Sequence, residues 1–333
     1  MKILLIQSDS LVHSLMITPI IRSLKTELDS EIHLLTYSRR ELLFKENPYI
    51  DKILSFEESD GLKKELKKNH FDYVLDYQNS LKTKIFRYGI GKETFAFKNE
   101  KIKQWLYCKT KINLLSKKHL VDQYFELLDP LNIKSDNLGY DFKIPDKDEV
   151  EREWLPDTHQ SEFALVAINA DFFTRKLPAN RLIELCDRIN KPIVLLGNEC
   201  DLDVANEIEE FFKRGTQAEE EEIEGLNKNA IIFNACGKFN FNQSASLIKQ
   251  ASWVFTHDNE WMHIAAALKK KVYTIWGNTT PLFGQYPYKN QFTVFENNKI
   301  NCRPCSPNGY SNCPKGHFKC MNDVTFDFYL AES

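Results

Sequence analysis

The sequence predicts an α/β protein with two doubly wound domains, each built on a parallel sheet. Short apolar runs alternate with amphipathic stretches through most of the 333 residues, and such alternation is typical of parallel sheets covered by helices. The alternation stops once, at residues 135–160, which are polar and rich in Asn, Gly, Pro and Asp. We therefore expect two Rossmann-like domains, residues 1–150 and 160–325, that face each other across a cleft.

Composition places the chain among ordinary soluble proteins. Charged residues make up 27% of the sequence and the net charge is -3, so nothing suggests that it binds nucleic acid. The N-terminus has one lysine and a strand-length apolar run, too short for a secretory signal. No apolar stretch approaches the roughly 20 residues that span a bilayer. We expect a cytoplasmic protein, and peripheral contact with the inner membrane stays open.

The first half should contain five strands with helices between them. The expected strands are residues 2–7, 31–37, 52–56, 72–78 and 94–98. Residues 12–28 repeat apolar side chains every four positions, which indicates one buried helix face. Pro19 should kink this helix or lie near its first turns.

The second half should contain five further strands. They are expected at residues 163–170, 192–198, 230–235, 253–258 and 271–277. The acidic run AEEEEIEG at residues 218–225 is predicted to be a solvated loop or helix end. Ligands of such sheets bind at the carboxyl ends of the strands, so the residues that follow each strand are the first candidates for a site.

Two strand-to-helix junctions contain side chains that could take part in catalysis or ligand binding. After the first strand, the stretch SDSLVHSLMITPIIRSLK contains the titratable side chains of Asp9 and His13. In the second half, WVFTHDNEWMHIAAAL begins a helix directly after a strand, and free N–H groups there favour an anion such as phosphate. Asp258 is a plausible N-cap of that helix.

Taken together, five segments resemble glycosyltransferase family 9, the heptosyltransferase family. ITPIIRSLK is similar to the first helix of that family. TRKLPANRLIELCDRI is similar to its Lys-Arg-Trp-Pro segment. IVLLGNECD resembles its Gly-ended strand, and ACGKFNFNQSASLIKQ its Gly-Lys helix. DNEWMHIAAAL followed by VYTIWGNTTP resembles Asp-Ser/Thr-Gly-Pro-Met-His and the Phe-Gly-x-Thr-x-Pro loop. The resemblance implies a GT-B fold.

The resemblance also implies an activity. A nucleotide-activated sugar such as ADP-heptose would bind the second domain, and a lipid-linked saccharide of the lipopolysaccharide type would bind the first. The acceptor hydroxyl would displace the nucleoside diphosphate with inversion, without a catalytic metal or other cofactor. The residues that match donor-binding positions are Arg175, Lys176, Glu199, Asp201, Asp258, Asn259, Glu260, His263 and Thr279.

Two departures from the family pattern matter for catalysis. Glu260 stands where the family has glycine, which places a carboxylate near the expected diphosphate. His13 aligns with the aspartate that resembling enzymes use as base, and a histidine suits proton removal at neutral pH. Asp9 is the second candidate for the base. Two alternatives therefore stay open: a catalytically inactive family member that serves as a binding or scaffold protein, and another GT-B enzyme such as a sugar-nucleotide epimerase.

Four of the eight cysteines lie close together, at Cys302, Cys305, Cys313 and Cys320. In a reducing compartment, a Cys-x2-Cys pair with two further cysteines favours a metal over disulfides. We expect a structural cluster that could hold zinc, with His317 as a substitute ligand. The other four cysteines, Cys108, Cys186, Cys200 and Cys236, are expected to be small core residues.

Overall fold

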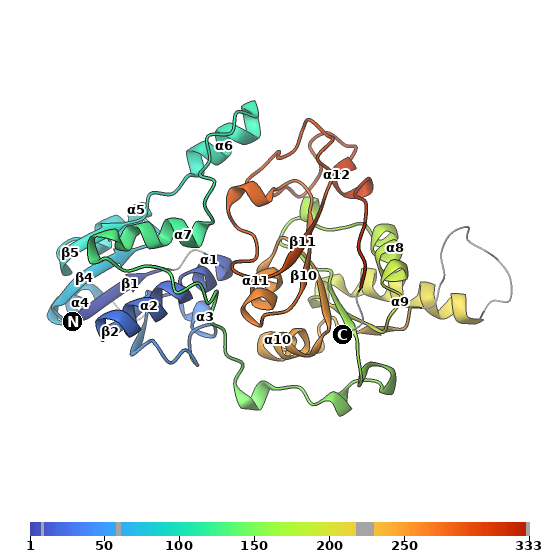
Figure 1. Ribbon diagram of the computed structural model, residues 1–333, viewed down its shortest axis with the longest axis horizontal. Helices are drawn as coiled ribbons and strands as arrows, with labels where there is room; N and C mark the ends of the chain where they lie inside the picture. The colour runs from blue at the N-terminus through green and yellow to red at the C-terminus, as the bar shows by residue number, and fades with distance from the viewer. Residues whose placement is uncertain (8–9, 58–60, 218–229, 331–333) are drawn as a thin grey trace. The chain divides into compact units, whose positions relative to one another are not determined.

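The computed structural model describes residues 1–7, 10–57, 61–217 and 230–330 (Figure 1). The chain divides into two compact units. The first comprises Met1–Ile102 and Leu115–Lys143, and the second comprises Lys103–Leu114 and Ile144–Ser333. Each unit has its own parallel sheet, as the alternation of strands and helices predicts.

The first unit contains a five-stranded sheet in the order β3-β2-β1-β4-β5. Its strands are β1 (Lys2–Ile6), β2 (Glu31–Thr36), β3 (Lys52–Ser55), β4 (Phe71–Asp76) and β5 (Gly91–Ala96). Every neighbouring pair is parallel. The central strands are apolar on both faces because helices cover both sides of such a sheet. The order 3-2-1-4-5 is that of a Rossmann fold, whose ligand crevice lies between the ends of β1 and β4.

The helices of the first unit are short. They are α1 (Leu11–Met16), α2 (Thr18–Leu28), α3 (Ser38–Glu41), α4 (Leu62–Lys68), α5 (Leu81–Arg87), α7 (Leu120–Phe125) and the 3₁₀ turn η1 (Glu126–Leu131). The single helix expected over residues 12–28 is two helices that meet at Ile17. Pro19 lies in the first turn of α2, where its missing N–H costs nothing. Met16, Ile20 and Leu24 are fully buried, as the four-residue spacing predicts.

A buried arginine fastens the end of the first unit to α2. The guanidinium of Arg22 binds the carboxylate of Asp136 at 2.6 Å, the carboxylate of Asp141 and the carbonyl oxygen of Gly139. These charge-assisted bonds raise the pKa of Arg22 further above its ordinary value, although burial alone would lower it. The polar stretch at residues 135–160 is therefore an ordered segment at its start, with ion pairs to a helix more than 100 residues away.

The second unit contains a six-stranded sheet in the order β11-β10-β9-β6-β7-β8. Its strands are β6 (Ala164–Ala167), β7 (Ile193–Leu196), β8 (Ile232–Asn234), β9 (Trp253–His257), β10 (Val272–Trp276) and β11 (Phe292–Glu296). All neighbours are parallel. Renumbered from β6, this is again the Rossmann order, so the reversal of strand order falls between β6 and β9.

The helices of the second unit are α6 (Lys101–Thr110, which begins in the first unit), α8 (Ala179–Ile189), α9 (Leu202–Gln217), α10 (Phe241–Gln250), α11 (Glu260–Ala267) and α12 (Lys319–Asn322). Short 3₁₀ turns complete it: η2 (Asp146–Asp148), η3 (Arg152–Trp154), η4 (Asp157–His159), η5 (Phe173–Arg175), η6 (Glu199–Asp201) and η7 (Pro281–Phe283). Within the described ranges, no helix is both long and apolar enough to cross a membrane.

Some expectations from the sequence differ from the structure. The strand β11 was not predicted, and β5 begins three residues before the predicted run. Cys108, Cys186 and Cys236 are buried, whereas Cys200 is exposed, so the prediction of a core role for Cys200 is wrong. The acidic run at residues 218–225 lies outside the described residues.

Candidate functional site

The reversal of strand order in the second unit brings two strand ends together. The segment after β6 supplies Asn169, and the segment after β9 supplies Asp258 and Asn259. All three are buried polar residues, at 4%, 6% and 6% exposure. Buried polar groups need hydrogen-bond partners, and Asn259 has one across the junction. Asn259 donates from its side-chain amide to the carbonyl oxygen of Asn169 at 2.8 Å.

Arg175 and Thr279 converge on the carboxylate of Asp258. The Nη2 of Arg175 lies 2.6 Å from Oδ2 of Asp258, and the hydroxyl of Thr279 donates to the same oxygen at 2.7 Å. The structure thus brings together three of the residues that the sequence singles out. The buried Nε of Arg175 has no hydrogen-bond partner among the described residues.

The cap of α11 is Asn259 and not Asp258. The side-chain oxygen of Asn259 accepts hydrogen bonds from the backbone N–H groups of Trp261, at 3.0 Å, and Met262, at 3.4 Å. The prediction that Asp258 caps this helix is therefore wrong. The carboxylate of Asp258 binds Arg175 instead. Asn259, which is also a good capping residue, occupies the N-cap position.

A second ion pair lies beside the first. The Nζ of Lys176 is 2.6 Å from Oδ1 of Asp201, and Oδ2 of Asp201 accepts from the backbone N–H of Asn198 at 3.0 Å. Asp201 is therefore buried and occupied within the protein. Glu199, the other carboxylate that the sequence offers for a ribose, is exposed. The geometry leaves Glu199 as the more accessible of the two.

Two histidines in this region are buried. Nε2 of His257 accepts from the backbone N–H of Leu177 at 3.0 Å, and Nδ1 lies 3.3 Å from the carbonyl oxygen of Asn169. Burial lowers the pKa of His257 to about 4, so this ring is neutral and orders two loops. His263 lies on the buried side of α11 at 1% exposure.

Glu260 opens α11 and is only partly covered by protein. Its Oε1 accepts a hydrogen bond from Asn169 at 3.4 Å. Desolvation of the carboxyl raises the pKa of Glu260, and the nearby charge of Asp171 acts in the same direction. The carboxyl group therefore stays protonated to a higher pH than an ordinary glutamate.

The first unit has its own reversal of strand order, between β1 and β4. After β1, His13 lies in the first turn of α1, where its backbone N–H donates to the capping Ser10 hydroxyl at 3.2 Å. Asp9 lies outside the described residues. After β4, Asp76 is fully buried and binds Arg87 at 2.5 Å. Sequence reasoning missed Asp76, which lies within the strand predicted at residues 72–78 and ends the observed strand β4.

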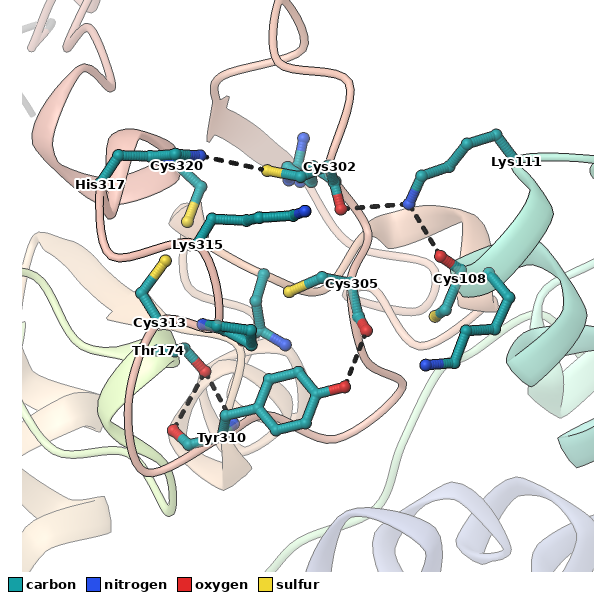
Figure 2. Close-up of a pocket in the computed structure, with 14 residues that line it drawn as sticks. Cys108, Lys111, Thr174, Cys302, Cys305, Tyr310, Cys313, Lys315, His317 and Cys320 are labelled. Atoms are coloured by element: carbon teal, nitrogen blue, oxygen red, sulfur yellow. Dashed lines mark hydrogen bonds between the residues drawn. The ribbon is translucent and has the colours of Figure 1, made fainter.

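The four clustered cysteines line one cavity of about 340 Å³ in the second unit (Figure 2). The described part of the chain contains no group of three or more His, Cys, Asp or Glu side chains with the arrangement needed to hold a metal ion. The expectation of zinc at Cys302, Cys305, Cys313 and Cys320 stays a prediction.

Comparison with known proteins identifies the family. The model of glycosyltransferase family 9 (heptosyltransferase) matches residues 60–314, more than half of the chain. The chain belongs to glycosyltransferase family 9. A search of curated proteins gave no match. Membership of the family confirms the resemblance drawn from the five motif segments.

Solved structures support the same assignment of fold. A family 9 glycosyltransferase from Veillonella parvula superposes with a TM-score of 0.67 at 18% identity, over 88% of this chain and 86% of that one. The ADP-heptose lipopolysaccharide heptosyltransferase II of E. coli gives 0.66 at 17% identity, over 97% and 98%. The E. coli heptosyltransferase WaaC with ADP gives 0.61 at 15%, over 88% and 93%. The expected GT-B fold is confirmed.

Two buried polar residues of the site, Asn169 and His257, were not among the donor-binding residues that the family resemblance implies. They link the segment after β6 to the end of β9. One signal was available for Asn169. It directly follows the apolar strand FALVAI, and polar residues at the carboxyl end of such a strand line the ligand crevice.

Proposed function

We propose that this family 9 glycosyltransferase is active and moves a heptose or related sugar from a nucleotide-sugar donor to an envelope glycan. The observation that supports a donor site most directly is the buried group of Arg175, Asp258 and Thr279 at the strand reversal of the second unit. One structural relative is named an ADP-heptose lipopolysaccharide heptosyltransferase. We extend the same class of donor, and a lipid-linked saccharide acceptor, to this chain.

Arg175 is the residue that we assign to the donor diphosphate. Asp258 fixes one edge of the guanidinium, and the buried Nε remains without a protein partner. A guanidinium held in this way presents N–H groups in a fixed plane, which suits phosphate oxygens. As the sugar leaves the nucleotide, negative charge grows on the diphosphate, and a positioned cation stabilises it.

Glu260 can be reconciled with a diphosphate nearby. A carboxylate would repel the donor, but burial favours the protonated form of this side chain. A neutral carboxyl can donate a hydrogen bond to a phosphate oxygen. We therefore assign Glu260 as a contact of the donor whose carboxyl group stays protonated to a higher pH than an ordinary glutamate.

We assign the catalytic base to His13 in the first unit, with Asp9 as the alternative. His13 follows β1 at the strand reversal, the place in a Rossmann sheet where functional groups gather. A neutral imidazole can take the proton of the attacking hydroxyl as that hydroxyl displaces the nucleoside diphosphate from the anomeric carbon.

A lipid-linked acceptor requires contact with a membrane, and α6 together with the residues that follow it offers a suitable surface. Ile102, Trp105, Ile112 and Leu114 are 82%, 56%, 57% and 55% exposed. Residues 101–114 contain four lysines and no acidic residue. Exposed Trp and aliphatic side chains among lysines are typical of helices that lie on anionic lipid. We assign this segment to peripheral contact with an anionic bilayer.

Calorimetric titration with ADP-, UDP- and GDP-sugars tests the donor assignment. We expect one class of nucleotide sugar to bind with a Kd in the micromolar to millimolar range. Arg175→Ala should weaken that binding about tenfold or more, because it removes a charge-assisted bond. Arg214→Ala, a change at an exposed helical arginine paired with Glu210, is the matched control and should bind normally.

Binding and turnover together separate the active enzyme from the alternatives. Donor binding without sugar transfer to any lipid-linked acceptor would favour the inactive scaffold protein. The epimerase alternative would require interconversion of the free nucleotide sugar without an acceptor. Absence of binding to every nucleotide sugar would refute the proposed function.

A further inference from the structure

Helix α5 of the first unit presents apolar side chains to solvent. Leu81, Ile85 and Tyr88 are 79%, 71% and 80% exposed. Their spacing of four and then three residues places them on one face of the helix, one turn after another. Single exposed apolar residues are ordinary on a protein surface, whereas a contiguous set of them marks a site of interaction. These three residues are called the α5 stripe below.

The opposite face of α5 is already used by the fold. Thr83 is buried at 1% exposure. The ring centroids of Phe86 and Phe56 are 5.3 Å apart, and both rings pack against the core of the first unit. Arg87 binds the buried carboxylate of Asp76 at 2.5 Å. The inner side chains therefore hold the helix in place, and the α5 stripe is free to contact a partner.

Lysines of the preceding helix, α4, border the α5 stripe. Nζ of Lys63 donates to the carbonyl oxygen of Ile85 at 2.7 Å. A Cβ placed on Gly89, the residue after Tyr88, would lie 3.7 Å from Nζ of Lys67, and Lys67 itself is exposed. The apolar side chains of α5 and the ammonium groups of α4 therefore belong to one surface.

The sequence that forms this surface is strongly basic. Four of the seven residues of α4 are lysines, and residues 81–92 contain four basic residues and no acidic one. Glu65, the acidic residue of α4, is paired with Lys52 at 3.4 Å. The whole chain has a net charge of -3, so positive charge is concentrated here. Such a surface attracts a negatively charged partner.

The form of the surface favours a lipid bilayer over a protein. Three side chains by themselves supply less than the roughly 800 Å² that each partner gives to a standard protein interface. In a bilayer, acyl chains surround each apolar side chain that enters, so even a narrow stripe buries most of its area. An apolar face bordered by lysines is typical of helices that lie in the interface of an anionic membrane.

We propose that the α5 stripe and the lysines of α4 form a docking surface for an anionic lipid bilayer. Leu81 and Ile85 enter the boundary between headgroups and acyl chains. Tyr88 lies at the level of the headgroups, where its ring is covered and its hydroxyl meets water. The lysines contact acidic headgroups. The inference rests on the proposed function only for the lipid-linked acceptor, and it uses a different helix from α6.

Vesicle flotation of the full chain tests the docking surface. The wild type should float with vesicles that contain phosphatidylglycerol and much less with phosphatidylcholine alone. The double variant Leu81→Ser and Ile85→Ser should lose about tenfold in apparent affinity for the anionic vesicles, because serine does not favour the acyl boundary. Leu138→Ser, at a leucine of the same unit that is 62% exposed, is the matched control. Normal binding by the double variant would overturn the proposal.

Fluorescence of an introduced tryptophan measures insertion without a contribution from α6. Tyr88→Trp is made in the Trp105→Ala background and compared with that parent. On anionic vesicles, the added emission should shift to shorter wavelength, and lipids brominated in their acyl chains should quench it. Emission that stays the same with and without vesicles would place position 88 in water and contradict the proposal.

Charge reversal and self-association test the choice of occupant. The double variant Lys64→Glu and Lys67→Glu should bind anionic vesicles about fivefold less well or worse, because acidic headgroups repel the new carboxylates. Lys134→Glu, at an exposed lysine outside the surface, is the control, and an equal loss there would remove the role of α4. Self-association of the wild type without vesicles, abolished by Ile85→Ser, would assign the α5 stripe to a second copy of the chain and overturn the lipid assignment.

The outcome for this surface is separable from the outcome for the proposed function. The variant with Leu81→Ser and Ile85→Ser should bind a nucleotide sugar with the Kd of the wild type and keep its Tm, because both side chains are exposed. A chain that docks through the α5 stripe and binds no nucleotide sugar would support the docking surface and refute the donor assignment. Donor binding together with vesicle binding that ignores both serine substitutions would refute the docking surface alone.

Discussion

The guanidinium of Arg175 and the carboxylate of Asp258 form an ion pair, 2.6 Å between Nη2 and Oδ2, at the strand reversal of the second unit. The pair joins the η5 turn after β6 to the end of β9. Both side chains are mostly buried, at 15% and 8% exposure. Such a pair fixes geometry more than it adds stability, because desolvation of both charges offsets their attraction.

Removal of Asp258 should therefore do more harm than its hydrogen bonds suggest. In Asp258→Ala, the Arg175 charge loses its partner, and we expect the free energy of unfolding to fall by about 3 kcal/mol. Affinity for the donor should fall as well, since Arg175 is no longer held. Chemical denaturation and calorimetry measure the two effects. Asp203→Ala, at an exposed position of α9, is the control, and an equal loss there would contradict the argument.

The carboxylates Glu199 and Asp201 should separate into two roles. Asp201 binds Lys176 and the backbone of Asn198, so Asp201→Asn should lower stability by about 1–3 kcal/mol. Glu199 is exposed and should be replaceable by alanine without loss of stability. If Glu199 binds the donor ribose, Glu199→Ala weakens donor binding alone. Thermal melts and calorimetry on both variants check this, and the reverse pattern would exchange the assignments.

Much of the architecture was predictable because its signals are local. Apolar runs such as KILLI and IVLL predicted ten of the strands in the described residues, with shifts of up to three residues at their starts. The strand FTVFE was missed, because its alternating pattern is short and follows a turn-rich stretch. The split of residues 12–28 into two helices follows from Pro19, whose ring favours the first turn of a helix.

The partners of the polar residues were not predictable, because they are set by the tertiary fold. Aspartate and asparagine are both good caps, and the sequence gives no reason to prefer Asn259 over Asp258. Arg175, 83 residues earlier, binds the carboxylate of Asp258, and Asn259 is therefore left to cap the helix. Arg22 likewise meets Asp136 only because the fold brings α2 beside the end of the first unit.

We expect the raised pKa of Glu260 to make donor binding pH-dependent. Burial raises this pKa above the ordinary value, so the carboxyl group loses its proton at a higher pH than a free glutamate. The sign follows from linkage. Between the ordinary and the raised pKa, the folded chain binds more protons than the unfolded chain, so stability falls as pH rises through that window.

Donor affinity should fall in the same direction, because the ionised carboxylate repels the diphosphate. Calorimetry of the donor across that range should show weaker binding at higher pH for the wild type. Glu260→Gln keeps a neutral hydrogen-bonding group and should flatten the dependence. The same slope in both proteins would remove Glu260 from the donor site.

His13 should control turnover and leave donor binding unchanged. His13→Ala should lower kcat about 10²-fold or more, which is the ordinary effect of losing a general base. The Kd for the donor should stay the same, because we assign the donor to the second unit. His70→Asn, at an exposed position with a positive φ of 50° that asparagine tolerates, serves as control. Full turnover by His13→Ala would transfer the role to Asp9 or to another group.

The α6 segment should attach the protein to anionic lipid through Trp105 and its lysines. Flotation with vesicles that contain phosphatidylglycerol should recover the wild type, and recovery should fall with rising salt because lysine contacts with the surface are screened. Vesicles of phosphatidylcholine alone should recover little. Trp105→Ala should weaken binding to the anionic vesicles several-fold, because the indole no longer enters the interface.

Trp154 provides a matched control, since it is 53% exposed but lies in the polar stretch at residues 152–154. Trp154→Ala should bind vesicles as the wild type does. Equal losses in both variants would mean that any exposed tryptophan supports binding, and α6 would have no special role. If wild-type chains instead self-associate without vesicles and Trp105→Ala abolishes that, the exposed face serves a second copy of the chain and the lipid assignment is wrong.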